Sequence, residues 1–106
     1  MVSLLKTLLN MEGYEVVALD VDSDVAAAVE REKPHALFMD VHLGEQSGMQ
    51  ILQSIRKNRK NSDLRIIMTS GLNMKDECIR GGADAFLLKP FMPDDLISAL
   101  KKSSAL

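Results

Sequence analysis

Three apolar runs in the chain each end in polar side chains that can take part in chemistry. They are ALFM before Asp40, LRIIM before Thr69 and Ser70, and AFLL before Lys89. A carboxylate can attack phosphorus to form an acyl phosphate, an ammonium can offset charge on the phosphoryl oxygens, and a hydroxyl can donate a hydrogen bond to them. Taken singly, each residue has an ordinary explanation as a turn former or a surface side chain. Taken together, they suit phosphoryl transfer.

These residues can act together only where the fold brings the ends of their runs to one place. Short apolar runs bounded by turn signals are typical of strands buried on both faces. The pattern predicts helices at 2–12, 25–32, from 47 to about 60, 74–80 and from 93 onward, and strands at 14–19, 35–40, 64–68 and 85–88. Such alternation indicates a parallel sheet with helices on both faces. The carboxyl ends of its strands share one edge, where open α/β sheets bind ligands.

Length and composition limit the alternatives. The chain has 106 residues, which fits one small domain, and a formal net charge of -2 from 13 basic and 15 acidic side chains. That balance gives no electrostatic reason to expect nucleic acid or an anionic membrane as a partner. No apolar run approaches a membrane span and no secretory signal opens the chain, so we expect a cytoplasmic protein. Cys78 is the single cysteine, which excludes an internal disulfide and disfavours a cysteine-based zinc site.

The motifs resemble those of the receiver domain of two-component response regulators, the phosphoacceptor module typified by the chemotaxis regulator. The resemblance rests on the spacing from Asp40 to Gly48, on the strand end LRIIMTSG and on the segment GGADAFLLKPF. It runs from residue 1 to about residue 104. It implies an α/β fold of the flavodoxin-like kind, a doubly wound parallel sheet with the strand order 2-1-3-4-5.

The resemblance also implies a role for each site residue. Asp40 is expected to be the phosphoacceptor, and Thr69 and Phe86 the switch hydroxyl and the switch aromatic residue. Lys89 and Ser70 are expected to bind the phosphoryl group. Mg²⁺ is the implied cofactor, held by Asp40 and by the backbone carbonyl of His42. The bond before Pro90 is expected to be cis.

The partners implied by the resemblance are a sensor histidine kinase or a phosphotransfer protein as the phosphoryl donor. The face formed by residues 73–104 is expected to bind a downstream output protein or a second copy of the chain. The interval from Thr69 to Lys89 is a couple of residues shorter than in most relatives, so we expect the helix near 74–80 to be short or displaced. The domain is expected to be a signalling module rather than an enzyme. A hydrolase or transferase is disfavoured, since the chain has no nucleophile elbow, no P-loop and no Cys–His pair.

One departure from the family concerns the beginning of the chain. Family members start with a strand that ends in two acidic residues, which hold the Mg²⁺, whereas this chain starts inside the first helix. We therefore expect residues 1–106 to be an N-terminally truncated receiver domain that lacks a central strand between 14–19 and 35–40. We expect its Mg²⁺ binding to be weakened or lost, and the chain alone to fold poorly or to use a partner strand. The alternative is a pseudo-receiver, which binds other proteins without being phosphorylated.

Overall fold

The structure is a computed structural model that describes residues 2–20 and 23–102. Its helices are α1 (Val2–Met11), α2 (Val25–Glu32), α3 (Gly48–Lys57), α4 (Lys75–Arg80) and α5 (Pro93–Lys102), with a 3₁₀ turn η1 (Arg59–Asn61) after α3. Its strands are β1 (Ala36–Asp40), β2 (His42–Leu43), β3 (Gln46–Ser47), β4 (Arg65–Ser70) and β5 (Ala85–Leu88). β1, β4 and β5 form a parallel sheet in that order, and β2 and β3 form a short antiparallel hairpin. The predicted α/β fold is confirmed.

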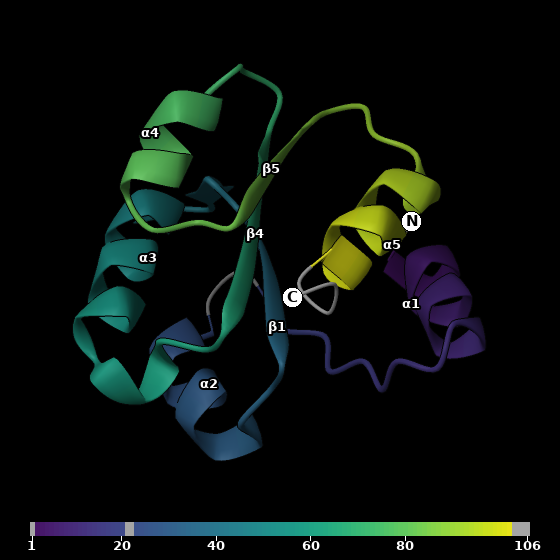
Figure 1. The fold of residues 1–106 in the computed structure, drawn as a ribbon, viewed down its shortest axis with the longest axis horizontal. Helices are drawn as coiled ribbons and strands as arrows, with labels where there is room; N and C mark the ends of the chain where they lie inside the picture. The colour runs from purple at the N-terminus through teal and green to yellow at the C-terminus, as the bar shows by residue number, and fades with distance from the viewer. Residues whose placement is uncertain (1, 21–22, 103–106) are drawn as a thin grey trace.

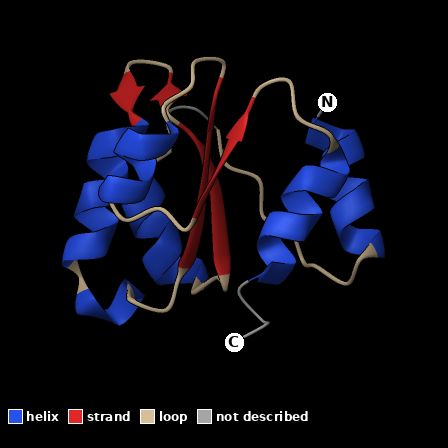
Figure 2. Ribbon diagram, turned by 45° about the horizontal axis from the view of Figure 1, so that its top comes forward, coloured by secondary structure: helices blue, strands red, loops and turns tan. Residues whose placement is uncertain are grey.

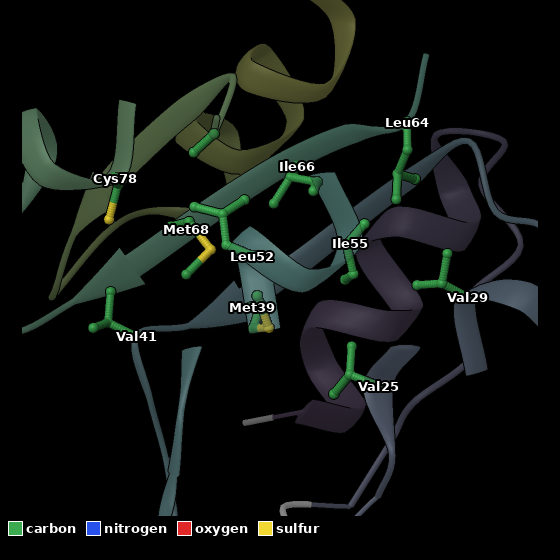
Figure 3. Close-up of a cluster of buried hydrophobic side chains, with 11 residues drawn as sticks. Val25, Val29, Met39, Val41, Leu52, Ile55, Leu64, Ile66, Met68 and Cys78 are labelled. Atoms are coloured by element: carbon green, nitrogen blue, oxygen red, sulfur yellow. The ribbon is translucent and has the colours of Figure 1, made fainter. Parts of the chain in front are cut away.

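The sheet lies between two layers of helices (Figure 1). α2, α3 and α4 cover one face, while α1 and α5 cover the other. β4 is the central strand and its side chains alternate between the layers. Ile66 and Met68 belong to the α3-side cluster, the larger group of buried side chains shown in Figure 3. Ile67 joins Leu9 and Leu96 in the smaller α5-side cluster. The continuous apolar run of β4 therefore reflects burial on both faces.

Side-chain caps set the starts of two helices. The Asp24 carboxylate accepts a hydrogen bond from the Ala27 N–H at 3.1 Å and begins α2. The Ser47 hydroxyl accepts from the Gln50 N–H at 3.4 Å and begins α3. α3 ends at Lys57, a turn earlier than expected, because the Asn58 side chain accepts from the Lys60 N–H at 3.0 Å and starts the 3₁₀ turn instead.

The strand predicted at 14–19 is wrong. Residues 14–20 belong to no strand, although Tyr14 and Val16 pack against the α5-side cluster. A strand requires a hydrogen-bonded neighbour, and β-rich composition alone cannot supply one. Among the described residues, β1 pairs with β4 alone, so residues 14–20 form no ladder with the sheet, and Val17 and Leu19 stay 53% and 38% exposed. Residues 41–47, between β1 and α3, contain the β2–β3 hairpin, which the sequence pattern did not predict.

Candidate functional site

The carboxyl ends of the three parallel strands meet at one edge of the sheet, together with the β2–β3 hairpin (Figure 2). The register places Asp40 of β1 beside Thr69 of β4, and Thr69 beside Leu87 of β5. Lys89 follows β5 directly. The structure therefore brings together the carboxylate, the hydroxyl and the ammonium that the sequence places at separate strand ends.

The Asp40 carboxylate is held by two donors. Its Oδ1 accepts a hydrogen bond from the backbone N–H of His42 at 2.9 Å, and its Oδ2 forms an ion pair with the Lys89 ammonium. The Asp40 side chain is 24% exposed and that of Lys89 is 46% exposed. The carboxylate is thus fixed in orientation, faces a cation and can still be reached from solvent. The His42 imidazole is on an exposed residue, and the contact that His42 makes with Asp40 comes from its backbone.

Gly48 allows α3 to begin in close contact with the end of β1. Its N–H donates to the Val41 carbonyl at 2.6 Å, while the Val41 N–H donates to the Thr69 carbonyl at 2.8 Å. A Cβ on Gly48 would lie 2.8 Å from the Val41 oxygen and closer still to that of Asp40, both of which are backbone atoms that cannot rotate away. Glycine lets α3 begin directly against the end of β1, and that packing fixes the loop that carries the His42 N–H.

The two hydroxyl side chains at the carboxyl end of β4 have different surroundings. Thr69 is buried, and its Oγ1 donates to the Leu87 carbonyl at 2.6 Å. Ser70 is also buried, but its Oγ accepts from the Leu72 N–H at 3.1 Å and so shapes the turn after β4. In this structure the Thr69 hydroxyl is directed at β5, and any contact with a group on Asp40 requires it to leave Leu87.

The segment around Lys89 joins the site to both helical layers. The peptide bond between Lys89 and Pro90 is cis. Phe86 is half-buried and packs against the α3-side cluster. Phe91 lies on the opposite side, where its ring meets that of Phe38 edge-on with 5.4 Å between centroids. The chain on either side of Lys89 is therefore anchored by one aromatic ring in each layer.

Sequence reasoning missed a cluster around Arg56 that holds the start of β5. The Arg56 guanidinium donates to the carbonyls of Gly82 and Asn61, each at 2.8 Å, and to the Asp84 carboxylate at 2.9 Å. The same Asp84 oxygen accepts from the Ile66 N–H of β4 at 2.8 Å. Because an arginine fork offers several donors in one plane, Arg56 ties α3 to the connection between α4 and β5. Nothing local in the sequence pairs these residues.

The described residues do not complete a site for the Mg²⁺ that the resemblance implies. Mg²⁺ prefers six oxygen ligands and is usually held by one or two carboxylates together with water or phosphate. Both oxygens of Asp40 already have protein donors. Across residues 2–20 and 23–102, no three His, Cys, Asp or Glu side chains are grouped so that they could hold a metal ion.

Cys78 is buried in the α3-side cluster, with its Sγ 3.7 Å from the Met49 Sδ. Burial raises the pKa of its thiol, and the neighbouring Glu77 carboxylate raises that pKa further. The thiol is therefore a packing group and a poor nucleophile.

Comparisons with known proteins agree with this geometry. The model of the family described as "Response regulator receiver domain" matches residues 1–101. The chain is 31% identical over 103 residues to the chemotaxis protein CheY of Thermotoga maritima, covering 95% of the chain and 86% of that protein. It is 30% identical over 96 residues to the phosphate regulon transcriptional regulatory protein PhoB of Pseudomonas aeruginosa, covering 88% of the chain. The chain spans only 42% of the length of PhoB.

Solved structures share the fold. One solved as that of a response regulator from Chloroflexus aurantiacus superposes with a TM-score of 0.85 at 28% identity, over 99% of this chain and 88% of that chain. The receiver domain of the sensor histidine kinase PA1611 from Pseudomonas aeruginosa superposes with a TM-score of 0.80 at 24% identity, over 98% of this chain and 88% of that one. That domain was solved with a magnesium ion in its active-site cleft. In the part of this chain that the structure describes, no helix is long and apolar enough to span a bilayer.

Proposed function

The chain belongs to the response regulator receiver domain family, and on this premise we propose that it accepts a phosphoryl group on Asp40. The donor is the phosphohistidine of a sensor histidine kinase or of a phosphotransfer protein. The observation that supports this most directly is the Asp40 carboxylate itself, held between the His42 N–H and the Lys89 ammonium at the carboxyl edge of the sheet. The domain acts in signalling, without turning over a separate substrate.

The chemistry follows from the surroundings of the carboxylate. Oδ2 attacks the phosphorus, so that a new P–O bond forms while the P–N bond to the donor imidazole breaks and its electron pair stays on that nitrogen. The His42 N–H keeps Oδ1 in place during this step. Lys89 moves from Oδ2 to the oxygens of the arriving group and neutralises part of their charge. Lys89 is the cation that the described residues offer for this purpose.

We further propose that phosphorylation acts on the rest of the domain through Thr69. A phosphoryl oxygen on Asp40 would compete with the Leu87 carbonyl for the Thr69 hydroxyl, and a neutral hydrogen bond of this kind is worth only about 1 kcal/mol. Release of Leu87 loosens β5 next to Phe86. The face that responds is formed by residues 73–104, of which 103 and 104 lie outside the described residues. The exposed apolar side chains within this range that a protein partner would bury are Ile79, Leu88 and Met92.

Intact-mass analysis after incubation with acetyl phosphate tests the proposal. The chain is incubated with and without Mg²⁺, next to an Asp40→Asn variant that keeps the shape of the side chain but cannot form the acyl phosphate. Circular dichroism of the same samples shows that both are folded. We expect one phosphoryl adduct on the parent chain and none on the variant. A folded parent chain that gains no adduct in either condition would contradict the proposal and favour a protein-binding module that is not phosphorylated.

A further inference from the structure

The end of α3 carries a group of exposed cations. Lys57 is the last residue of α3, and Arg59 and Lys60 belong to the 3₁₀ turn that follows it. In residues 2–20 and 23–102 the ion pairs all involve other cations, so these three are unpaired there. We name them together the basic turn. The helix dipole accounts for a cation at Lys57 but not for the two that lie beyond the helix.

Hydrogen bonds hold the backbone of the basic turn in place. The Asn58 side chain accepts from the Lys60 N–H at 3.0 Å, and the Asn61 side chain donates to the Ile55 carbonyl at 3.2 Å. The Arg56 guanidinium donates to the Asn61 carbonyl at 2.8 Å. A partner therefore meets backbone that is already ordered, so that binding costs little conformational entropy there.

The charges around the basic turn leave this part of the surface positive. It is formed by the ends of α2 and α3 and the residues that follow them, 30–35 and 56–65, which lie side by side (Figure 1). Two acidic side chains, Glu32 and Asp84, are already paired with Arg31 and Arg56. The unpaired acids in these two ranges are Glu30 and Asp63, and the unpaired cations are Lys33, Lys57, Arg59, Lys60 and Arg65. Like charges this close repel one another, and a bound anion relieves that repulsion.

We propose that the basic turn is a docking site for an acidic segment of another protein, in which several aspartate or glutamate side chains follow one another. Carboxylates suit Arg59, whose planar guanidinium binds them through two parallel hydrogen bonds. Lys57 and Lys60 flank it and attract further carboxylates of the same segment. The contact depends on charge, so we expect it to be reversible and to weaken as salt is added.

The surroundings of the basic turn favour a protein over the other common polyanions. A membrane surface takes up apolar side chains together with the cations, but no large exposed apolar side chain of the described chain lies between residues 25 and 71. Single-stranded nucleic acid stacks on aromatic rings, and the aromatic residues of the chain lie outside both ranges. A nucleic acid duplex presents many phosphates, which a chain with a net charge of -2 repels over most of its surface.

The basic turn is separate from the Asp40 site. It lies at the carboxyl end of α3, whereas the Ser47 cap at the other end of this ten-residue helix is next to the β2–β3 hairpin and the carboxyl edge of the sheet. Ten helical residues span about 15 Å. A segment bound at the basic turn therefore leaves Asp40 open to its phosphoryl donor, and the two sites can be occupied together.

Titration of the unmodified chain with a labelled octaglutamate peptide tests the proposal, with octaglutamine as the uncharged control. Fluorescence anisotropy at low salt should show binding of octaglutamate alone, and the affinity should fall as salt rises to about 0.15 M. In NMR spectra of the same titration, the backbone amides of residues 57–61 should shift most. Single-stranded DNA of equal charge and phosphatidylserine vesicles are the competing probes, and both should bind more weakly than the peptide.

Two double variants separate the basic turn from the net charge of the chain. Arg59→Gln with Lys60→Gln removes two cations from the turn, and Lys6→Gln with Lys75→Gln removes two exposed cations elsewhere. The first pair should weaken octaglutamate binding about tenfold, which is a loss of about 1.4 kcal/mol, and the second should leave it nearly unchanged.

Equal weakening by the two double variants would overturn the proposal. So would the absence of octaglutamate binding at low salt, amide shifts centred outside residues 57–61, or tighter binding of the DNA or the vesicles than of the peptide. Circular dichroism shows that both variants are folded, and should the first fail to fold, the amide shifts of the unmodified chain decide. None of these results depends on whether Asp40 is phosphorylated.

Discussion

Arg56→Ala should be among the most destabilising single changes outside the apolar core. The Arg56 side chain is 18% exposed, and its guanidinium makes two 2.8 Å hydrogen bonds to carbonyls as well as the ion pair with Asp84. Hydrogen bonds to charged groups contribute about 1.5–3 kcal/mol each. The Asp84 side chain is 40% exposed, so its ion pair adds about 0–1 kcal/mol. Since these terms share one side chain and are not additive, we expect a loss of about 3 kcal/mol.

Arg31→Ala is the matched control. Arg31 also forms an ion pair, with Glu32 at 3.1 Å, but the two side chains are 63% and 39% exposed. Such a surface pair contributes about 0–1 kcal/mol. Chemical denaturation followed by circular dichroism gives the free energy of unfolding of both variants and of the parent chain. If Arg56→Ala costs no more than Arg31→Ala, then the cluster around Arg56 does not hold β5 as described.

Three further predictions concern the site and its supports. Gly48→Ala should lower the yield of the Asp40 phosphoryl adduct at equal folded content, because a Cβ there displaces the end of β1. Gly71→Ala is the control, since a Cβ on Gly71 meets open space and should leave the yield unchanged. An equal loss of adduct in both variants would contradict this prediction. Thr69→Val should destabilise the fold by about 1 kcal/mol, since it removes the hydrogen bond to the Leu87 carbonyl. The phosphoryl adduct should still form in the intact-mass assay. Loss of the adduct would show instead that the hydroxyl is needed for phosphorylation of Asp40. Cys78 has a pKa raised above its ordinary value of 9.0, so its contribution to stability is complete below pH 9.0 and is lost as the pH rises through the raised value. The free energy of unfolding, measured by denaturation at rising pH, should therefore fall more steeply for the parent chain than for Cys78→Ala. An equal fall in both proteins would refute this prediction.

The convergence of Asp40, Thr69 and Lys89 could be predicted because it depends on local signals. Each residue ends an apolar run, and parallel strands place such ends at one edge. The Lys89–Asp40 ion pair adds a contact that the pattern alone could not place. Ser70 was expected to bind the phosphoryl group, and that role stays a prediction, since the contact seen for its hydroxyl is with the Leu72 N–H.

The features that were missed depend on contacts that no local sequence pattern reports. Residues 14–19 have strand composition but no neighbouring strand, so the backbone there stays unpaired. Arg56 binds Asp84, which lies 28 positions away in the sequence, and no hydrophobic periodicity or short motif predicts such a pair. The β2–β3 hairpin depends on Gly48 lying against the end of β1, which is a matter of available space rather than of propensity.

The two helical layers bury unequal amounts of apolar surface, and this difference predicts which layer unfolds first. The α3-side cluster combines residues from three helices with the side chains of two strands, whereas the α5-side cluster is smaller and includes one turn of α1 through Leu9. Sub-global unfolding starts where the least apolar surface must be exposed. The α1 helix should therefore detach before the rest, which breaks the exposed ion pair between Glu12 and Lys101 of α5. A protease that samples such openings would meet the connection after α1 first, while the layer that carries Phe86 remained closed.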